Sequence, residues 1–281
     1  MKHRLLTLFA LAATLTLTHA AEDLQAATKK IFEQRKDSVV WVSVVAKITI
    51  NSTDSKTPLN IPDQEKKFEA VGTIVDPVGL VVCALSNIDP TKDITGREIN
   101  TANGRLKLDA SATLKEVKIV MPDGTEIPAD VVMKDADLDL AFVRIKADAK
   151  EAKGVTYPAL DLRDSAQGRV ADEVVTVSRA DEVLNRQPMV LRGQITCMIA
   201  KPRVFLRAVG SAPGSPTFAM DGKLLGIGVT RSAKEKGSVL VVLPAADVLE
   251  IADQAKAAKP LPAEITKPAA EKPAEKSADA K

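Results

Sequence analysis

Histidine is nearly absent from this sequence, which has two histidines, His3 and His19, among its 281 residues. Both lie in an N-terminal segment that has the order of a secretory signal. A basic start, Met1–Arg4, is followed by an apolar stretch, Leu5–Leu17, and then by small residues. The apolar stretch is shorter than the roughly 20 residues that a membrane-spanning helix needs. We therefore expect residues 1–20 to be a signal peptide and the mature protein to be periplasmic or extracellular.

Cleavage at this point would leave a mature chain without histidine. Histidine is a common nitrogen ligand of zinc and the commonest general acid or base in enzymes. Its absence excludes His-ligated zinc, a histidine base and a Ser-His-Asp triad. We expect neither a metal nor a cofactor in this protein.

Aromatic residues and net charge are also scarce. The chain has one tryptophan and one tyrosine, and its net charge is +2. Loss of the signal removes Lys2 and Arg4 and no acidic residue, so the 37 acidic residues are then matched by 37 of the 39 basic ones. Nucleic-acid binding usually needs a basic excess and stacking rings. We therefore expect no nucleic-acid partner.

Cysteine is limited to two residues, Cys83 and Cys197. In an exported protein two cysteines can form a disulfide bond. They can equally be two free thiols buried on strands, because free cysteine is among the most buried residue types. The sequence leaves both alternatives open, and metal binding by two cysteines alone is not expected.

The apolar residues are arranged mostly in short β-branched runs that are separated by turn residues. This pattern predicts an all-β fold, a barrel or a sandwich, rather than alternating strands and helices. The predicted strands are 38–50, 67–75, 80–85, 117–121, 126–132, 140–145, 173–177, 189–199, 204–209, 224–229 and 239–243. Helical periodicity is confined to 22–36 and 245–255. Turn sequences separate two pairs of strands, at Asp76–Gly79 and Pro122–Gly124.

Three further segments are polar. Residues 51–66 and 89–115 have the composition of long loops, and loops of this length are usually functional or disordered. From about Gln254 the chain consists mainly of Ala, Lys, Pro and Glu, so we expect a disordered tail over 254–281. With six lysines and four acidic residues, the tail could contact a membrane surface or cell wall, whereas a solubilising role is the simpler interpretation.

Several segments resemble trypsin-like serine proteases, in particular the bacterial Deg/HtrA-type periplasmic branch. Gly72–Val82 (GTIVDPVGLVV) resembles that family's G-x-G-x-I-x-D-x-x-G-x-I-x-T run. Ala129–Ile145 (ADVVMKDADLDLAFVRI) resembles its stretch A-x-V-x-x-x-D-x-x-x-D-L-A-L-L-x-V. Further resemblances, in the family's order, lie at Ser38–Val40, Pro122–Gly124, Pro158–Ser165, Glu173–Val177, Asp221–Ile227 and Leu243–Pro244. Order and spacing match over most of 22–253.

This resemblance implies two six-stranded β-barrels, with a cleft between them that holds histidine, aspartate and serine in the family. The first barrel would cover about 38–150 and the second about 153–243, followed by a terminal helix at 244–253. Deg-type members usually carry a peptide-binding PDZ domain next, and we expect none here, because about 28 residues follow Asp253. The family's trimer is not carried over, so the oligomeric state stays open.

Alignment with the family places its catalytic positions on three residues. The histidine position, counted along the strand after Gly79, is Ser86, and the aspartate is retained as Asp139. The nucleophile motif G-x-S-G-[GS]-P falls on Ser211–Pro216, which puts the nucleophile position at Pro213. The other oxyanion-loop positions are Ser211, Ala212, Gly214 and Ser215.

These replacements remove the parts that the family's reaction needs. A serine hydroxyl is a weak nucleophile without an adjacent base, and Ser86 cannot accept a proton at neutral pH. Pro213 lacks both the hydroxyl and the backbone N–H, which is one of two oxyanion donors in the family. Loss of one such donor alone costs about 3 kcal/mol of transition-state stabilisation. The resemblance therefore implies a protease homologue without the family's catalysis, in which we interpret Asp139 as structural.

Other interpretations of the same residues stay open. Ser211 or Ser215 could be a displaced nucleophile with Lys201 or Lys223 as its base, although serines in Gly/Pro-rich turns are usually turn residues. A two-residue shift of the alignment would put Ser215 at the nucleophile position and still supply no histidine. Three functions therefore compete: a pseudoprotease that binds a peptide or protein, a hydrolase with Ser-Lys chemistry, and a structural envelope protein. The sequence does not identify the partner.

Overall fold

The computed structural model describes residues 22–53, 61–92, 94–101, 104–233, 237–262 and 264–265. The expected signal peptide at 1–20 and most of the expected tail lie outside these residues. The chain forms two compact units. The larger unit contains Phe68–Ile88, Glu116–Leu261 and the chain up to Val44, and the smaller contains Val45–Lys67, Asp89–Lys115 and the chain from Pro262. None of the described helices is long and apolar enough to cross a membrane.

The first described element is a helix over residues 22–35, which continues as a 3₁₀ turn at Lys36–Ser38. Ile31, on the predicted apolar face, is buried, whereas most charged residues of the helix are exposed. The helical conformation ends at Val39, whose backbone is extended and which opens the β-branched run. The predicted N-terminal helix is confirmed.

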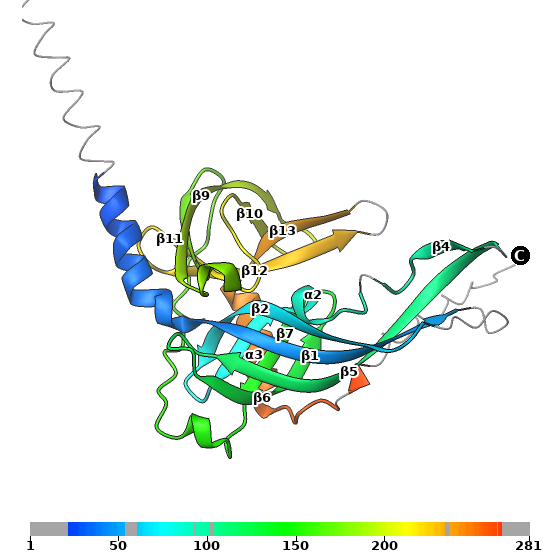
Figure 1. Cartoon of the computed structure of the whole chain (residues 1–281). Helices are drawn as coiled ribbons and strands as arrows, with labels where there is room; N and C mark the ends of the chain where they lie inside the picture. The colour runs from blue at the N-terminus through cyan, green and yellow to red at the C-terminus, as the bar shows by residue number, and fades with distance from the viewer. Residues whose placement is uncertain are drawn as a thin grey trace, which may run out of the picture. The chain divides into compact units, whose positions relative to one another are not determined.

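Six strands form the first barrel in the order β1-β2-β3-β7-β6-β5, and β1 also pairs with β5 (Figure 1). They are β1 (Val39–Ser52), β2 (Gln64–Asp76), β3 (Leu80–Ala84), β5 (Gly104–Val120), β6 (Glu126–Asp135) and β7 (Leu140–Ile145). The predicted turns between β2 and β3 and between β5 and β6 are confirmed. In each, an aspartate side chain, Asp76 or Asp123, accepts the backbone N–H two residues later, and a glycine with positive φ follows.

The second barrel is a closed ring of six strands in the order β10-β13-β12-β11-β8-β9. They are β8 (Glu173–Arg179), β9 (Pro188–Ile199), β10 (Phe205–Ala208), β11 (Pro216–Ala219), β12 (Leu224–Ala233) and β13 (Gly237–Pro244). Short 3₁₀ turns lie in the connections, at Lys150–Ala152 and Glu182–Leu184. The sequence does not predict β11, because this strand directly follows the Gly/Pro-rich loop 211–215. The two barrels confirm the fold that the family resemblance implies.

The segment 89–115, which the sequence predicts to be a loop, is largely strand in the smaller unit, so this prediction is wrong. β5 begins at Gly104 and forms a hairpin with β4 (Glu98–Thr101). Alternate residues of β5, from Leu106 to Ala110, are buried, which is the two-residue period of a strand. The other expected loop, 51–66, is shortened from both ends, because β1 and β2 extend into it.

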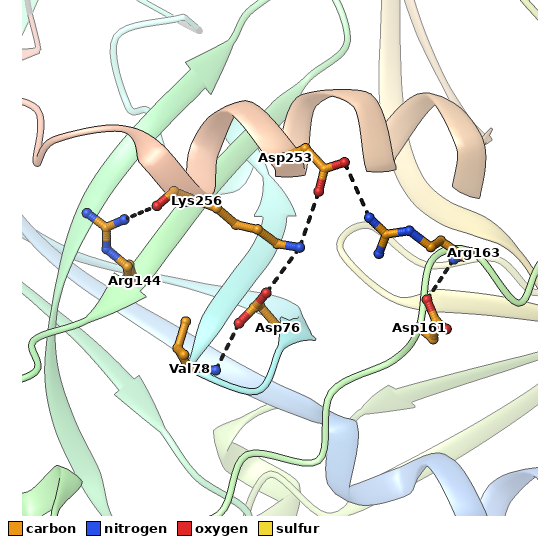
Figure 2. Close-up of polar contacts among 7 residues, drawn as sticks. All are labelled: Asp76, Val78, Arg144, Asp161, Arg163, Asp253 and Lys256. Atoms are coloured by element: carbon orange, nitrogen blue, oxygen red, sulfur yellow. Dashed lines mark hydrogen bonds and ion pairs between the residues drawn. The ribbon is translucent and has the colours of Figure 1, made fainter.

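Helix α3 (Ala245–Ala257) begins as predicted but continues past the expected end at Asp253, so the expected tail boundary at 254 is wrong. Ala255 is fully buried, which favours helix beyond Asp253. The ammonium of Lys256 then pairs with Asp76 in the β2–β3 turn at 3.1 Å and with Asp253 at 3.2 Å (Figure 2). The hydrogen bond to Asp76 raises the pKa of Lys256. Two short elements complete the described chain, α2 (Leu85–Ile88) and β14 (Glu264–Ile265).

Candidate functional site

Ser86 and Asp139 meet at the end of β3. Ser86 lies in α2, directly after β3, and Asp139 directly precedes β7, which neighbours β3 in the sheet. One carboxylate oxygen of Asp139 accepts the Ser86 N–H at 2.7 Å, and the other accepts the Ser86 hydroxyl at 3.0 Å. The Asp139 carbonyl accepts the N–H of Leu85 at 2.9 Å. The residue that the alignment assigns to the histidine position is therefore hydrogen-bonded to the aspartate.

A third donor to the Asp139 carboxylate comes from the second barrel. The backbone N–H of Thr230, in β12, donates to Oδ2 at 2.7 Å. Asp139 is 1% exposed and has a φ of 58°, which asparagine and aspartate tolerate better than most residues. A buried carboxylate with three such donors fixes the backbone around it. This geometry supports a structural role for Asp139. Sequence patterns do not identify Thr230, because a backbone donor has no side-chain signature.

The oxyanion loop, residues 211–215, has few backbone N–H groups free to bind a substrate. Pro213 has none. The other donor–acceptor pairs are Gly214 to Gly228 at 2.7 Å, Ser215 to Ala212 at 3.2 Å and Ser211 to Ala208 at 3.5 Å. Of these five residues, only Ala212 keeps an N–H without an acceptor in the part of the chain that the structure describes. The family's oxyanion site uses two converging N–H donors. With a single free N–H among its described residues, this loop does not form such a site.

Gly214 packs the same loop against the first barrel. Its carbonyl accepts the buried hydroxyl of Thr73, in β2, at 2.8 Å. Its φ is 71°, and a Cβ at this position would stand 1.9 Å from the Val71 carbonyl oxygen and 3.5 Å from the Ala84 nitrogen. Only glycine fits a left-handed position with the backbone this close. The loop therefore lies against the end of β3, two residues before Ser86.

β12 carries the loop on its other side. A Cβ at Gly228 would stand 1.9 Å from the Ala212 carbonyl oxygen and 3.4 Å from the Pro213 nitrogen. Thr230, which binds Asp139, follows two residues later on the same strand. The segments that carry Ser86, Asp139 and Pro213 therefore meet at the end of β3 and beside β12. Within the described residues, no hydrogen bond joins Pro213 to Ser86 or Asp139.

The three candidate serine hydroxyls are all engaged in hydrogen bonds. Ser86 donates to Asp139, and Ser211 donates to the Ala208 carbonyl at 2.8 Å. Ser215 donates to the Ser178 hydroxyl at 2.8 Å and is 0% exposed, so it is not available as a displaced nucleophile. No lysine bonds to any of the three serines in the described chain. The suggested bases, Lys201 and Lys223, are exposed, whereas a lysine base needs desolvation.

The two cysteines are free thiols, so of the two open alternatives the disulfide bond is wrong. Cys83 is fully buried in β3 of the first barrel, and Cys197 is exposed on β9 of the second. The alternative of two buried thiols is confirmed for Cys83 alone. Burial, and next the charge of Asp139, raise the pKa of the Cys83 thiol to about 12.

This contrast predicts selective alkylation. Only a thiolate reacts with iodoacetamide, so we expect one label per native chain at pH 8, at Cys197. Raising the pH to 9 should leave Cys83 unlabelled, because its pKa of about 12 keeps the thiol protonated and burial excludes the reagent. In urea both cysteines should react. Mass spectrometry of tryptic peptides measures the sites, and rapid native labelling of Cys83 would contradict the described packing of β3.

Comparison with known proteins adds relatives to this geometry. A family model described as a trypsin-like peptidase domain matches residues 70–227. A protein named "probable periplasmic serine endoprotease DegP-like" from Rhizobium meliloti (strain 1021) is 29% identical over 153 residues. One of the same name from Brucella suis biovar 1 is 27% identical over 154 residues. Each match covers 48% of this chain and only 27% of the relative's length.

A solved structure, that of the MamO protease domain from Magnetospirillum magneticum, is also similar. The match covers 78% of this chain and 97% of that chain, with 16% sequence identity and a TM-score of 0.45. The family model spans more than half of the present chain and includes the segments of Ser86, Asp139 and Pro213. The protein therefore belongs to the trypsin-like peptidase family, with DegP-like proteins among its relatives.

Proposed function

We propose that this protein is an exported member of the family that has lost the peptidase reaction and binds an extended peptide or protein segment without cutting it. The observation that carries the proposal is the state of Asp139. Its carboxylate is buried and bound by Ser86 and Thr230, with no base between it and a nucleophile. Export is supported by the signal-like sequence at residues 1–20 and by relatives whose name includes "periplasmic".

The proposed loss of catalysis follows from three absent groups. A serine nucleophile needs a base that takes its proton, and serine at position 86 is no base at neutral pH. Position 213 has no hydroxyl, and the serines on either side of it donate their hydroxyl protons elsewhere. Apart from Ala212, the residues around Pro213 that have an N–H donate it to backbone carbonyls. Substrate binding is what remains when base, nucleophile and oxyanion donors are all missing.

Beyond Thr230, whose N–H is bound by Asp139, one edge of β12 has no strand partner among the described residues, which supports the proposed binding. Gly228 donates its N–H to Ser215 at 2.9 Å and accepts from Gly214, so its backbone groups face the loop. Groups of alternate residues face the same edge of a strand, and this edge therefore also carries the N–H and carbonyl of Ser232. β11 pairs with β12 only as far as Ile227, and Ser232 is exposed. An extended segment could add to this edge as a further strand.

Two measurements test the proposal. The mature protein should leave casein intact and should not react with a fluorophosphonate probe. A DegP-like relative, run in parallel as the positive control, should cleave casein and react with the probe. Cleavage or labelling that disappears in Ser211→Ala or Ser215→Ala would overturn the loss of catalysis.

Binding is measured separately, by anisotropy of fluorescein-labelled β-casein. We expect Ser232→Pro to weaken binding at least tenfold, because proline removes the edge N–H without removing a bond to β13. Ser232→Ala keeps the N–H and should bind like the unchanged protein. Equal binding by all three proteins would exclude the β12 edge as the site.

A further inference from the structure

The chain after α3 is held at three successive points. The Arg144 guanidinium donates to the carbonyl of Lys256 at 3.0 Å and to that of Ala258 at 2.7 Å, and Figure 2 shows the first of these bonds. The N–H of Leu261 donates to the Val131 carbonyl at 2.8 Å. Glu264 and Ile265 then form β14, which appears as a short arrow beside β5 in Figure 1. Ala258 and Leu261 thus contact β7 and β6, and residues 264–265 pair with β5.

The edge that receives β14 has no other strand partner there. β6 pairs with β5 only at Lys118–Val120, where its last paired residue is Pro128, which has no N–H. Beyond Pro128, β6 pairs with β7. In the described chain, the β5 edge around Ala112–Thr113 is therefore covered by β14 alone. Open strand edges readily accept another extended segment.

The occupying segment is suited to this edge and only loosely fastened to it. Pro260 and Pro262 fix their φ angles near those of extended chain, which lowers the entropy lost on docking. The same prolines donate no hydrogen bond, so few backbone bonds hold the segment. The Leu261 side chain is 40% exposed and adds little burial. Segments with few bonds and little buried apolar surface open at low free energy.

We propose that the β5 edge at Ala112–Thr113 is a strand-addition site whose resident occupant is this chain's own Glu264–Ile265, held reversibly. The site is distinct from the β12 edge and does not rest on the proposed loss of catalysis. When the segment leaves, the edge of β5 becomes available to another extended segment of the same kind. A protein without this occupant would present an unpaired strand edge to solvent.

A disulfide trap tests the occupant. Thr113 and Glu264 are opposite each other in the β5–β14 pair, and opposed strand residues have a Cα separation that suits a disulfide bond. In a Cys197→Ser background, Thr113→Cys/Glu264→Cys should form a disulfide within one chain. Lys107→Cys/Glu264→Cys is the matched control, because Lys107 lies on the same strand but pairs with Glu98. We expect the effective thiol concentration, titrated with glutathione, to be at least tenfold higher in the first pair.

The result can overturn the proposal in two ways. Equal cross-linking of the two pairs would show that the segment does not dock in this register. A predominantly dimeric disulfide product would assign the edge to a second copy rather than to the chain itself. Loss of the difference in urea is the expected control for folding.

Reversibility is tested on the same variant. A labelled synthetic peptide of residues 258–268 should bind the reduced Thr113→Cys/Glu264→Cys protein at least tenfold more tightly than the oxidised form, in which the disulfide holds the resident segment in place. Equal binding to the two forms would mean that peptide and segment do not share an edge, and would overturn the proposal.

Discussion

Replacing Gly214 with alanine is expected to destabilise the protein by more than 3 kcal/mol. Alanine at the φ of 71° costs about 1–2 kcal/mol, because the left-handed region is strained for residues with a Cβ. The new Cβ would also stand 1.9 Å from the Val71 carbonyl oxygen, so the backbone of the loop or of β2 must move. Such overpacking costs a further 1–3 kcal/mol or so, and it would strain the buried Thr73–Gly214 hydrogen bond.

The matched control is Gly124→Ala. Gly124 also has positive φ, 87°, but a Cβ there meets nothing within 4 Å. It should therefore show the backbone strain alone, about 1–2 kcal/mol. Urea unfolding followed by circular dichroism measures both variants. If the two substitutions cost the same, the close packing of the 211–215 loop on the first barrel is not as described.

The sequence predicts most barrel strands well but misses β11 and the strands within 89–115. Strands such as β3 and β7 are short, apolar and bounded by turns, so the local sequence is enough to identify them as strands. β11 is equally buried, but its four residues follow Gly214 and Ser215 and open with Pro216, which read as a loop. The long polar segment 89–115 becomes strand through the hairpin of β4 with β5 and through the pairing of β5 with β1, and pairing with a distant strand leaves a weaker local pattern.

The candidate site also has a part that the sequence predicts and a part that it does not. The aligned positions Ser86, Asp139 and Pro213 come from motif spacing, and two of them lie in direct contact. What holds the site is less visible in the sequence. The N–H of Thr230 and the carbonyl of Gly214 are backbone groups, which every residue carries, so only the fold shows which of them approach the site. The resemblance predicts which residues stand at the aligned positions, and the structure adds the contacts that occupy their polar groups.

Replacing Asp139 with alanine is expected to cost about 4 kcal/mol of unfolding free energy. The variant removes an acceptor from two backbone donors and one hydroxyl, and a buried donor left without a partner costs about 1–3 kcal/mol. It also puts alanine at a φ of 58°. Asp139→Asn keeps the shape and tolerates this φ, but its amide NH₂ faces a donor on one side, so we expect about half the loss.

Asp137→Ala is the control, because Asp137 is exposed two residues earlier and its side chain has no described partner; it should change stability by less than about 0.5 kcal/mol. Hydrogen exchange adds a local readout. The amides of Ser86 and Thr230 should lose protection in Asp139→Ala and keep it in Asp137→Ala. Unchanged protection of both amides would mean that the carboxylate does not hold them. Their common loss would establish that the aspartate fastens α2 to β12, a role that needs no histidine and no nucleophile.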